Sequence, residues 1–122
     1  DLFEALDRLC TTGIEEGWLA NREGGGVRFG RVLRNDHPAT GGHSVDVVLM
    51  DSVVGPYHAH PLGEIDLVLP RTDGAQFDDH SRGWVSYPPE SAHAPTVSGG
   101  AAVVVYLLPG GAIDFTAAEE RS

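Results

Sequence analysis

Two short segments of the chain carry histidines and acids at spacings typical of a metal site. The first segment, GPYHAHPLGE, ends at Glu64. Residues two apart in an extended chain point to the same side, so His58 and His60 are expected to face one cavity. A Pro-Leu-Gly turn over 61–63 follows, after which Glu64 begins another predicted strand and Asp66 shares its face.

The second segment, GWVSYPPESAH, passes through a proline turn and ends at His93. Imidazole nitrogens and a carboxylate oxygen suit Fe(II), Mn, Co, Ni or Zn, so we expect one divalent transition metal whose identity the ligand types leave open. Such a site keeps an open position where a substrate oxygen or a water is activated. The predicted ligands are His58, His60, Glu64 and His93.

The alternative for any single histidine is an ordinary solvated or hydrogen-bonded side chain. A His-x-His pair alone is more often of that kind, and the nearby glutamate and the second segment are what favour a metal. The remaining histidines lie in polar loops or at a strand edge and are expected to stay outside the site: His37, His43 and His80.

Length and charge limit what the chain can be. Its 122 residues suffice for one core, so we expect a single domain over 1–122, with a helix at 1–17, a barrel at 26–115 and a tail at 116–122. Eight basic against 18 acidic residues give a net charge of −10, which argues against nucleic acid or an anionic membrane as partner. The longest apolar run, 101–108, is far shorter than the roughly 20 residues that span a bilayer.

Cysteine content and the amino-terminal residues bear on location. One cysteine excludes an intrachain disulfide, and the first ten residues lack the basic start of a signal peptide, so a cytoplasmic location is expected. The chain begins without Met, and we expect residues of the natural protein to be missing before Asp1.

The elements that must position these residues are one helix and a set of strands. Apolar residues from Leu2 to Ile14 follow helical spacing, and Gly17 is well placed to end that helix. Beyond it, short β-type runs alternate with turn residues, which predicts strands at 27–34, 43–50, 64–69, 83–87 and 101–108 and weaker ones at 54–57 and 112–115. The run 101–108 is apolar on both faces, as in a central strand.

The apolar outer face of 64–69 needs a cover, either the helix or a second subunit, so we expect a homodimer.

The two histidine segments resemble the signature motifs of the cupin superfamily through His58, His60, Glu64, Gly83, Pro88 and His93. The second motif departs from the usual pattern, because Gly83 and Pro88 are one residue closer than usual and Glu90 and Val97 replace the common Gly and Asn. The resemblance implies an all-β fold, a small cupin-type double-sheet jelly-roll barrel with the N-terminal α-helix leaning on it. It implies a metal but no particular reaction, because cupins include many enzymes and some binders.

A narrower resemblance covers roughly residues 13 to 115. It rests on the blocks EGWLANRE, VRFGR, GEID, YPPESAHAPTVSGG and YLLPGGAIDF, which are similar to the 4-hydroxylaminobenzoate lyase family of bacterial nitroaromatic degradation. The resemblance implies conversion of 4-hydroxylaminobenzoate, or a close aromatic hydroxylamine, to 3,4-dihydroxybenzoate plus ammonia. Family members usually carry a helical segment before this point, in line with a missing amino-terminal part.

The implied reaction adds water and releases ammonia without oxidant, reductant or organic cofactor, so it needs acid–base groups near the metal. The candidates are Glu90, Tyr87 and Asp66. Each has a structural alternative: a surface-turn glutamate, a barrel-lining tyrosine and a carboxylate that orients a ligand histidine.

An aromatic acid also needs its carboxylate held, which the planar guanidinium of arginine does well. All eight basic residues are arginines, and Arg22 and Arg31 are the candidates, with ordinary solvation as the alternative. Phe29, Trp84 and Tyr106 are candidates to pack against the ring, although aromatic residues at strand spacing usually belong to the core.

Two other functions stay open. The same ligand set supports an Fe(II) dioxygenase that acts on a small aromatic acid, and a cupin can also bind a small acid without catalysis. Ammonia release without oxygen would distinguish the lyase from the dioxygenase.

Overall fold

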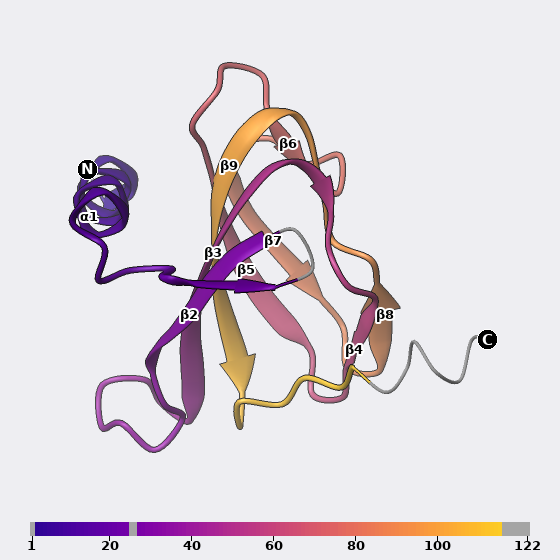
Figure 1. Cartoon of the computed structure of the whole chain (residues 1–122). Helices are drawn as coiled ribbons and strands as arrows, with labels where there is room; N and C mark the ends of the chain where they lie inside the picture. The colour runs from indigo at the N-terminus through magenta and orange to yellow at the C-terminus, as the bar shows by residue number, and fades with distance from the viewer. Residues whose placement is uncertain (1, 25–26, 116–122) are drawn as a thin grey trace.

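The computed structural model describes residues 2–24 and 27–115 of the chain. Its elements, in chain order, are α1 (Leu2–Glu16), β1 (Arg22–Gly24), β2 (Val27–Leu33), β3 (His43–Val54), β4 (His58–His60), β5 (Glu64–Pro70), β6 (Gln76–Phe77), β7 (Gly83–Tyr87), β8 (Ser91–His93) and β9 (Thr96–Pro109). The molecule has three layers, with α1 on one side of a large sheet and the short strands β4 and β8 on the other (Figure 1). The predicted all-β fold with an N-terminal helix is confirmed, and the predicted tail lies outside the described residues.

Helix α1 covers the outer face of the large sheet. Cys10 and Ile14 are buried in one cluster with Leu67 and Leu69 of β5, so the apolar spacing of the helix is used to bury its inner stripe. Gly17, at a φ of +82°, ends the helix as predicted. Of the two expected covers for this face, the helix is the one seen, and the predicted homodimer stays a prediction. None of the helices in the described ranges has the length and apolarity needed to cross a bilayer.

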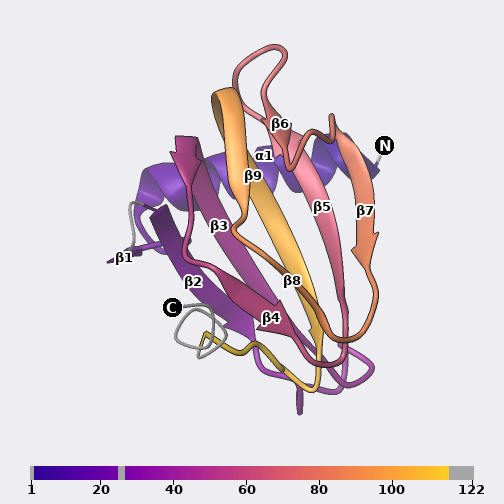
Figure 2. The same ribbon diagram turned by 90° about the vertical axis from the view of Figure 1, so that its right-hand side faces the viewer.

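The large sheet has the strand order β1-β2-β3-β9-β5-β7, and β6 pairs with the upper part of β9 (Figure 2). Strand β9 lies between β3 and β5, with Val104 opposite Val48 on one side and Val68 on the other. All three valines are buried in the core between the two sheets. The central position predicted for 101–108 from its two apolar faces is therefore confirmed.

The second sheet consists of β4 and β8, which pair antiparallel and lie over the inner face of the large sheet (Figure 2). Its register places His58 opposite His93. This pairing joins the two histidine segments, and it is the feature of the fold on which the site depends.

Several strand boundaries differ from the prediction. Strand β3 continues to Val54, and β9 begins at Thr96, because the two pair along their whole length around a bulge near Asp51. A strand at 54–57 was wrong, since the chain leaves the sheet at Gly55-Pro56, where the Gly55 N–H donates to Pro95 O at 2.7 Å. The expected strand at 112–115 is reduced to one bridge between Asp114 and Ala59. Strands β1, β4, β6 and β8 are not among the predicted strands, because runs this short show no periodicity in the sequence.

Candidate metal centre

Four side chains converge at the end of the small sheet. The ligand atoms of His58, His60, Glu64 and His93 lie within 4.8 Å of one another. Within the described ranges, this is the group of His, Cys, Asp and Glu that could hold a metal ion. The sequence-predicted ligands are thus brought together by the fold.

Local structure explains how β4 presents its two imidazoles. His58 and His60 are buried while the intervening Ala59 points the other way, which is the alternation of an extended strand. Gly63 then turns the chain with a φ of +87°, so that Glu64 becomes the first residue of β5. A Cβ on Gly63 would lie 2.9 Å from Tyr87 O, so this turn is tight as well as left-handed.

The distances within the group are short. His60 Nε2 lies 2.9 Å from His58 Nε2 and 3.1 Å from His93 Nε2, and it contacts Glu64 Oε2 directly. Glu64 Oε2 is 3.7 Å from His93 Nε2. All four donor atoms therefore surround one small volume.

The hydrogen bonds of the other ring nitrogens indicate what that volume suits. His58 Nδ1 lies 2.9 Å from Pro56 O, and His93 Nδ1 lies 2.6 Å from Asp78 Oδ2. Both acceptors need a hydrogen, so each Nδ1 carries the proton and each Nε2 presents its lone pair to the group. Lone pairs facing one another beside a carboxylate repel unless a cation lies between them. The residues therefore fit a divalent metal ion.

Electrostatics agree with this arrangement. Burial lowers the pKa of His58 to about 4, which keeps its imidazole neutral near pH 7. Burial alone would raise the pKa of Glu64, but the close approach of His60 and of the Asp66 carboxyl group outweighs that effect and lowers it, so Glu64 is a carboxylate. Burial and the adjacent Glu64 raise the pKa of Asp66, so Asp66 stays protonated.

Asp78 is a residue of the site that the sequence did not point to. Its Oδ2 accepts hydrogen bonds from His93 and from the Tyr87 hydroxyl, at 2.7 Å for the latter, and its Oδ1 accepts from Thr96 N at 2.9 Å. Burial would raise the pKa of Asp78, but these hydrogen bonds outweigh it and lower the pKa. The sequence signal that could have pointed to Asp78 is the Asp-Asp pair at 78–79, directly after β6. Aspartate tolerates the positive φ of 47° that is found at Asp78.

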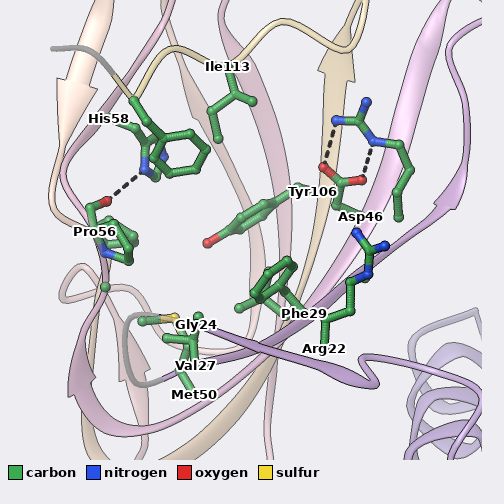
Figure 3. A pocket seen from close by; sticks show the side chains of 16 residues that line it. Arg22, Gly24, Val27, Phe29, Asp46, Met50, Pro56, His58, Tyr106 and Ile113 are labelled. Carbon is green, nitrogen blue, oxygen red and sulfur yellow. Dashed lines mark hydrogen bonds and ion pairs between the residues drawn. The ribbon is translucent and has the colours of Figure 1, made fainter.

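A cavity of about 470 Å³ adjoins the cluster, and His58 forms part of its wall (Figure 3). Apolar side chains that include Phe29, Val48, Met50 and Ile113 line much of it. The predicted carboxylate-binding residues Arg22 and Arg31 both line it as well, and Trp84, which is about half exposed, is not among the lining residues.

The two arginines differ in their partners. Arg31 Nε and Nη2 donate to Asp46 at 2.7 and 3.1 Å, an ion pair that raises the pKa of Arg31. Arg22 forms no ion pair with another described residue, and Figure 3 shows its guanidinium reaching toward Asp46. The charged side of the cavity thus holds two cations and one anion.

The three acid–base candidates occupy different surroundings. Asp66 is fully buried on the inner face of β5, and the ring of Tyr87 is tilted against that of His93, with ring centroids 4.8 Å apart. Glu90 is exposed in the proline turn with a φ of +67°, and its backbone N–H donates to His60 O at 2.8 Å. None of the three candidates is among the cavity-lining residues.

The three remaining histidines lie apart from the group. His37 Nδ1 accepts from Ala39 N at 3.1 Å, and His43 Nδ1 lies 3.2 Å from Thr40 O, so both are used within their own loop. His80 is exposed, and its backbone pairs with Phe77.

Comparison with known proteins identifies close relatives by sequence. The model of a family described as PnbB, 4-hydroxylaminobenzoate lyase, matches residues 1–115. A 4-hydroxylaminobenzoate lyase of Nocardioides sp. (strain LMS-CY) is 35% identical over 94% of this chain and 73% of its own length. The enzyme of that name from Pseudomonas putida is 31% identical over 94% of this chain and 74% of its own length.

Solved structures support the fold. A cupin-like protein from Thermotoga maritima superposes with a TM-score of 0.53 at 15% identity, over 73% of this chain and 74% of its own. An oxalate oxidase in complex with the substrate analogue glycolate superposes with a TM-score of 0.55 at 20% identity, over 76% of this chain and 56% of its own. At such identities the likeness confirms the predicted cupin fold and says nothing of the reaction.

Proposed function

Because this chain belongs to the 4-hydroxylaminobenzoate lyase family, we propose that it is a metal-dependent lyase that converts 4-hydroxylaminobenzoate, or a close aromatic hydroxylamine, to 3,4-dihydroxybenzoate and ammonia. The observation that carries the proposal is the meeting of the His58, His60, Glu64 and His93 group with an apolar cavity that has arginines on its other side. A metal-binding end and a cationic end on one apolar space suit an aromatic acid with a reactive substituent.

The reaction balances as hydroxylaminobenzoate plus water giving dihydroxybenzoate plus ammonia. When bound by the three histidines and Glu64, a divalent metal would supply Lewis acidity next to the substrate substituent. The chain itself must bind the ring, hold its carboxylate and keep protons near the site.

The apolar walls are suited to the ring. Phe29 from β2, Val48 and Met50 from β3 and Ile113 after β9 give the cavity flat and branched surfaces against which an aromatic ring can pack. The cavity volume of about 470 Å³ lies within the roughly 300–1,000 Å³ of small-molecule sites. Exclusion of water by these walls would strengthen each polar contact that the substrate makes.

Arg22 is the proposed main partner of the substrate carboxylate, with Arg31 as its neighbour. Asp46 already accepts two hydrogen bonds from Arg31, so two of the nitrogens of the Arg31 guanidinium group already have a partner. Two arginines and one aspartate leave a net charge of about +1 on this side, which matches a monocarboxylate.

Proton-holding roles are proposed for Asp66 and Tyr87, which lie next to the ligands. Burial raises the pKa of both, with the Glu64 carboxylate adding to it for Asp66 and the hydrogen bond to Asp78 for Tyr87, so each retains its proton near pH 7. Glu90 remains the third candidate, although its exposed turn would have to bring the carboxylate inward. The predicted cytoplasmic location likewise stays a prediction.

The proposal is tested by incubating the purified protein with 4-hydroxylaminobenzoate under strict anaerobiosis. We expect ammonia and 3,4-dihydroxybenzoate in equal amounts from the wild type and from His80→Ala, and loss of both products in His60→Ala. His80 is the matched control because it is a histidine outside the metal group. A requirement for oxygen would favour a dioxygenase, and binding without any turnover would favour a non-catalytic cupin.

A further inference from the structure

Tyr106 occupies a central place between the two ends of the cavity. It lies on β9, where the strand register places it opposite Asp46 of β3 and Asp66 of β5. Residues directly opposite across antiparallel strands project to the same face, so these three side chains form a row on the inner face of the large sheet. Asp46 belongs to the charged side of the cavity, and Asp66 shares its strand face with the ligand Glu64.

The ring of Tyr106 is fixed in the core, and its hydroxyl is not used there. The residue is only 5% exposed, and its ring lies 6.2 Å from that of Phe77 between centroids. Figure 3 shows the hydroxyl pointing across the cavity toward the wall formed by His58 and Pro56. Among the described residues, no group forms a hydrogen bond with this hydroxyl.

Because this hydroxyl faces the cavity and has no partner in the described part of the protein, solvent or a ligand in the cavity has to satisfy it. Burial, together with the negative charges of Glu64 and Asp78, raises the pKa of Tyr106 well above its ordinary value. The hydroxyl therefore keeps its hydrogen throughout the physiological range and is available as a donor.

The position of this donor matches one end of an aromatic acid. Figure 3 shows Tyr106 between His58 on one side and Asp46 and Arg22 on the other. A benzoate held by Arg22 at its carboxylate would extend along the apolar walls, with its opposite substituent toward His58. That substituent would lie in the part of the cavity into which the Tyr106 hydroxyl points.

We propose that Tyr106 is a substrate-binding residue whose hydroxyl donates a hydrogen bond to the oxygen or nitrogen of the ring substituent opposite the carboxylate. This inference rests on the proposed function, since it assumes an aromatic acid in the cavity. With this hydrogen bond, Tyr106 would favour ligands that carry a hydrogen-bond acceptor at that position. Ligands of the same shape with an apolar group there would bind more weakly.

The test is a titration of the protein, by calorimetry, with 4-hydroxybenzoate and with 4-methylbenzoate, which have nearly the same shape. The wild type is expected to bind 4-hydroxybenzoate about three- to tenfold more tightly, the range for one neutral hydrogen bond. In Tyr106→Phe this preference is expected to vanish while 4-methylbenzoate binds as before, because the ring that packs on Phe77 is retained. Metal content is measured in each sample so that unequal loading is not mistaken for a lost hydrogen bond.

Tyr57→Phe is the matched control, because it removes a hydroxyl from a tyrosine that does not line the cavity. It should keep the wild-type preference. Retention of the preference in Tyr106→Phe, or its absence in the wild type, would overturn the role of Tyr106 and leave the proposed function standing. If neither compound binds to the wild type, the proposed aromatic-acid cavity is itself wrong.

Discussion

His93 Nδ1 and Asp78 Oδ2 lie 2.6 Å apart, and this hydrogen bond turns Nε2 of the imidazole toward the other ligands. Asp78 is itself held by Tyr87 and by the backbone of Thr96, so its carboxylate cannot easily rotate away. A carboxylate that accepts from the far nitrogen of a ligand histidine fixes the tautomer and makes the ring a better ligand. Asp78 is therefore a positioning residue that acts through His93.

Asp78→Asn should weaken metal binding by about 10- to 100-fold, because an amide accepts a weaker hydrogen bond than a carboxylate and can present its NH₂ group to His93 instead. The affinity is measured by competition with a chromogenic chelator, which gives a readout independent of turnover. Asn tolerates the positive φ at this position, so the backbone should be retained.

Asp79→Asn is the control for Asp78→Asn, since Asp79 also has a positive φ but its side chain is exposed. It should bind metal as the wild type does. Equal affinities in the two variants would show that the hydrogen bond to His93 has no part in holding the metal.

Gly63→Ala tests the turn that places His60 next to Glu64. A Cβ there combines a positive φ with a contact of 2.9 Å to Tyr87 O, so the backbone has to move. We expect a loss in the free energy of unfolding of about 2–4 kcal/mol, measured by urea titration, together with weaker metal binding.

Gly74→Ala separates the cost of the positive φ from the cost of the close contact. Gly74 has a similar φ of +84°, but nothing lies within 4 Å of the added Cβ. It should cost only about 1 kcal/mol and leave metal affinity unchanged. Equal losses in Gly63→Ala and Gly74→Ala would mean that the tight contact at Gly63 is unimportant.

Arg22→Gln should raise KM for 4-hydroxylaminobenzoate by about tenfold or more with a smaller effect on kcat, because a charged hydrogen bond to the carboxylate contributes mainly to binding. Steady-state kinetics under anaerobic conditions give both parameters. Arg28→Gln is the control, because it removes the same charge from a residue of β2 that does not line the cavity. It should leave KM near the wild-type value. A similar rise in KM in both variants would point to the overall charge instead of a specific contact.

Cys10 reports on the docking of α1 onto β5. Burial raises the pKa of its thiol above the ordinary value of 9.0, so the unfolded chain releases this proton at a lower pH than the folded chain. The folded state thus binds more protons from about pH 9 upward, and the contribution of Cys10 to stability is present below that pH and lost as the pH rises. The wild type should lose stability above about pH 9 more steeply than Cys10→Ala in urea titrations under reducing conditions. Parallel pH profiles would indicate that the helix does not bury the thiol.

The convergence of the four proposed metal ligands could be predicted because most of it is local. His58 and His60 need only strand alternation, and Glu64 needs only the turn at Gly63, all within one segment. Likewise, the apolar stripe of α1 and the two apolar faces of 101–108 follow from residue spacing, and both elements are found, although β9 begins earlier than predicted, at Thr96.

The rest depends on contacts that spacing does not determine. Asp78 contacts His93 only through the fold, because the loop after β6 and strand β8 are not adjacent in the sequence. The pairing of Arg31 with Asp46 depends on the register between β2 and β3, which alternation leaves free. For the same reason the sequence could name Tyr106 as an aromatic residue without indicating where its hydroxyl points.

The proposed function requires that His58, His60, His93 and Glu64 hold a divalent metal ion on which turnover depends. Elemental analysis of protein purified without chelator or metal-affinity resin tests it most directly, combined with anaerobic ammonia release before and after chelation and metal restoration. We expect about one transition-metal ion per chain, loss of turnover when the metal is removed and recovery of turnover when it is restored. Full turnover by protein without stoichiometric metal would contradict it.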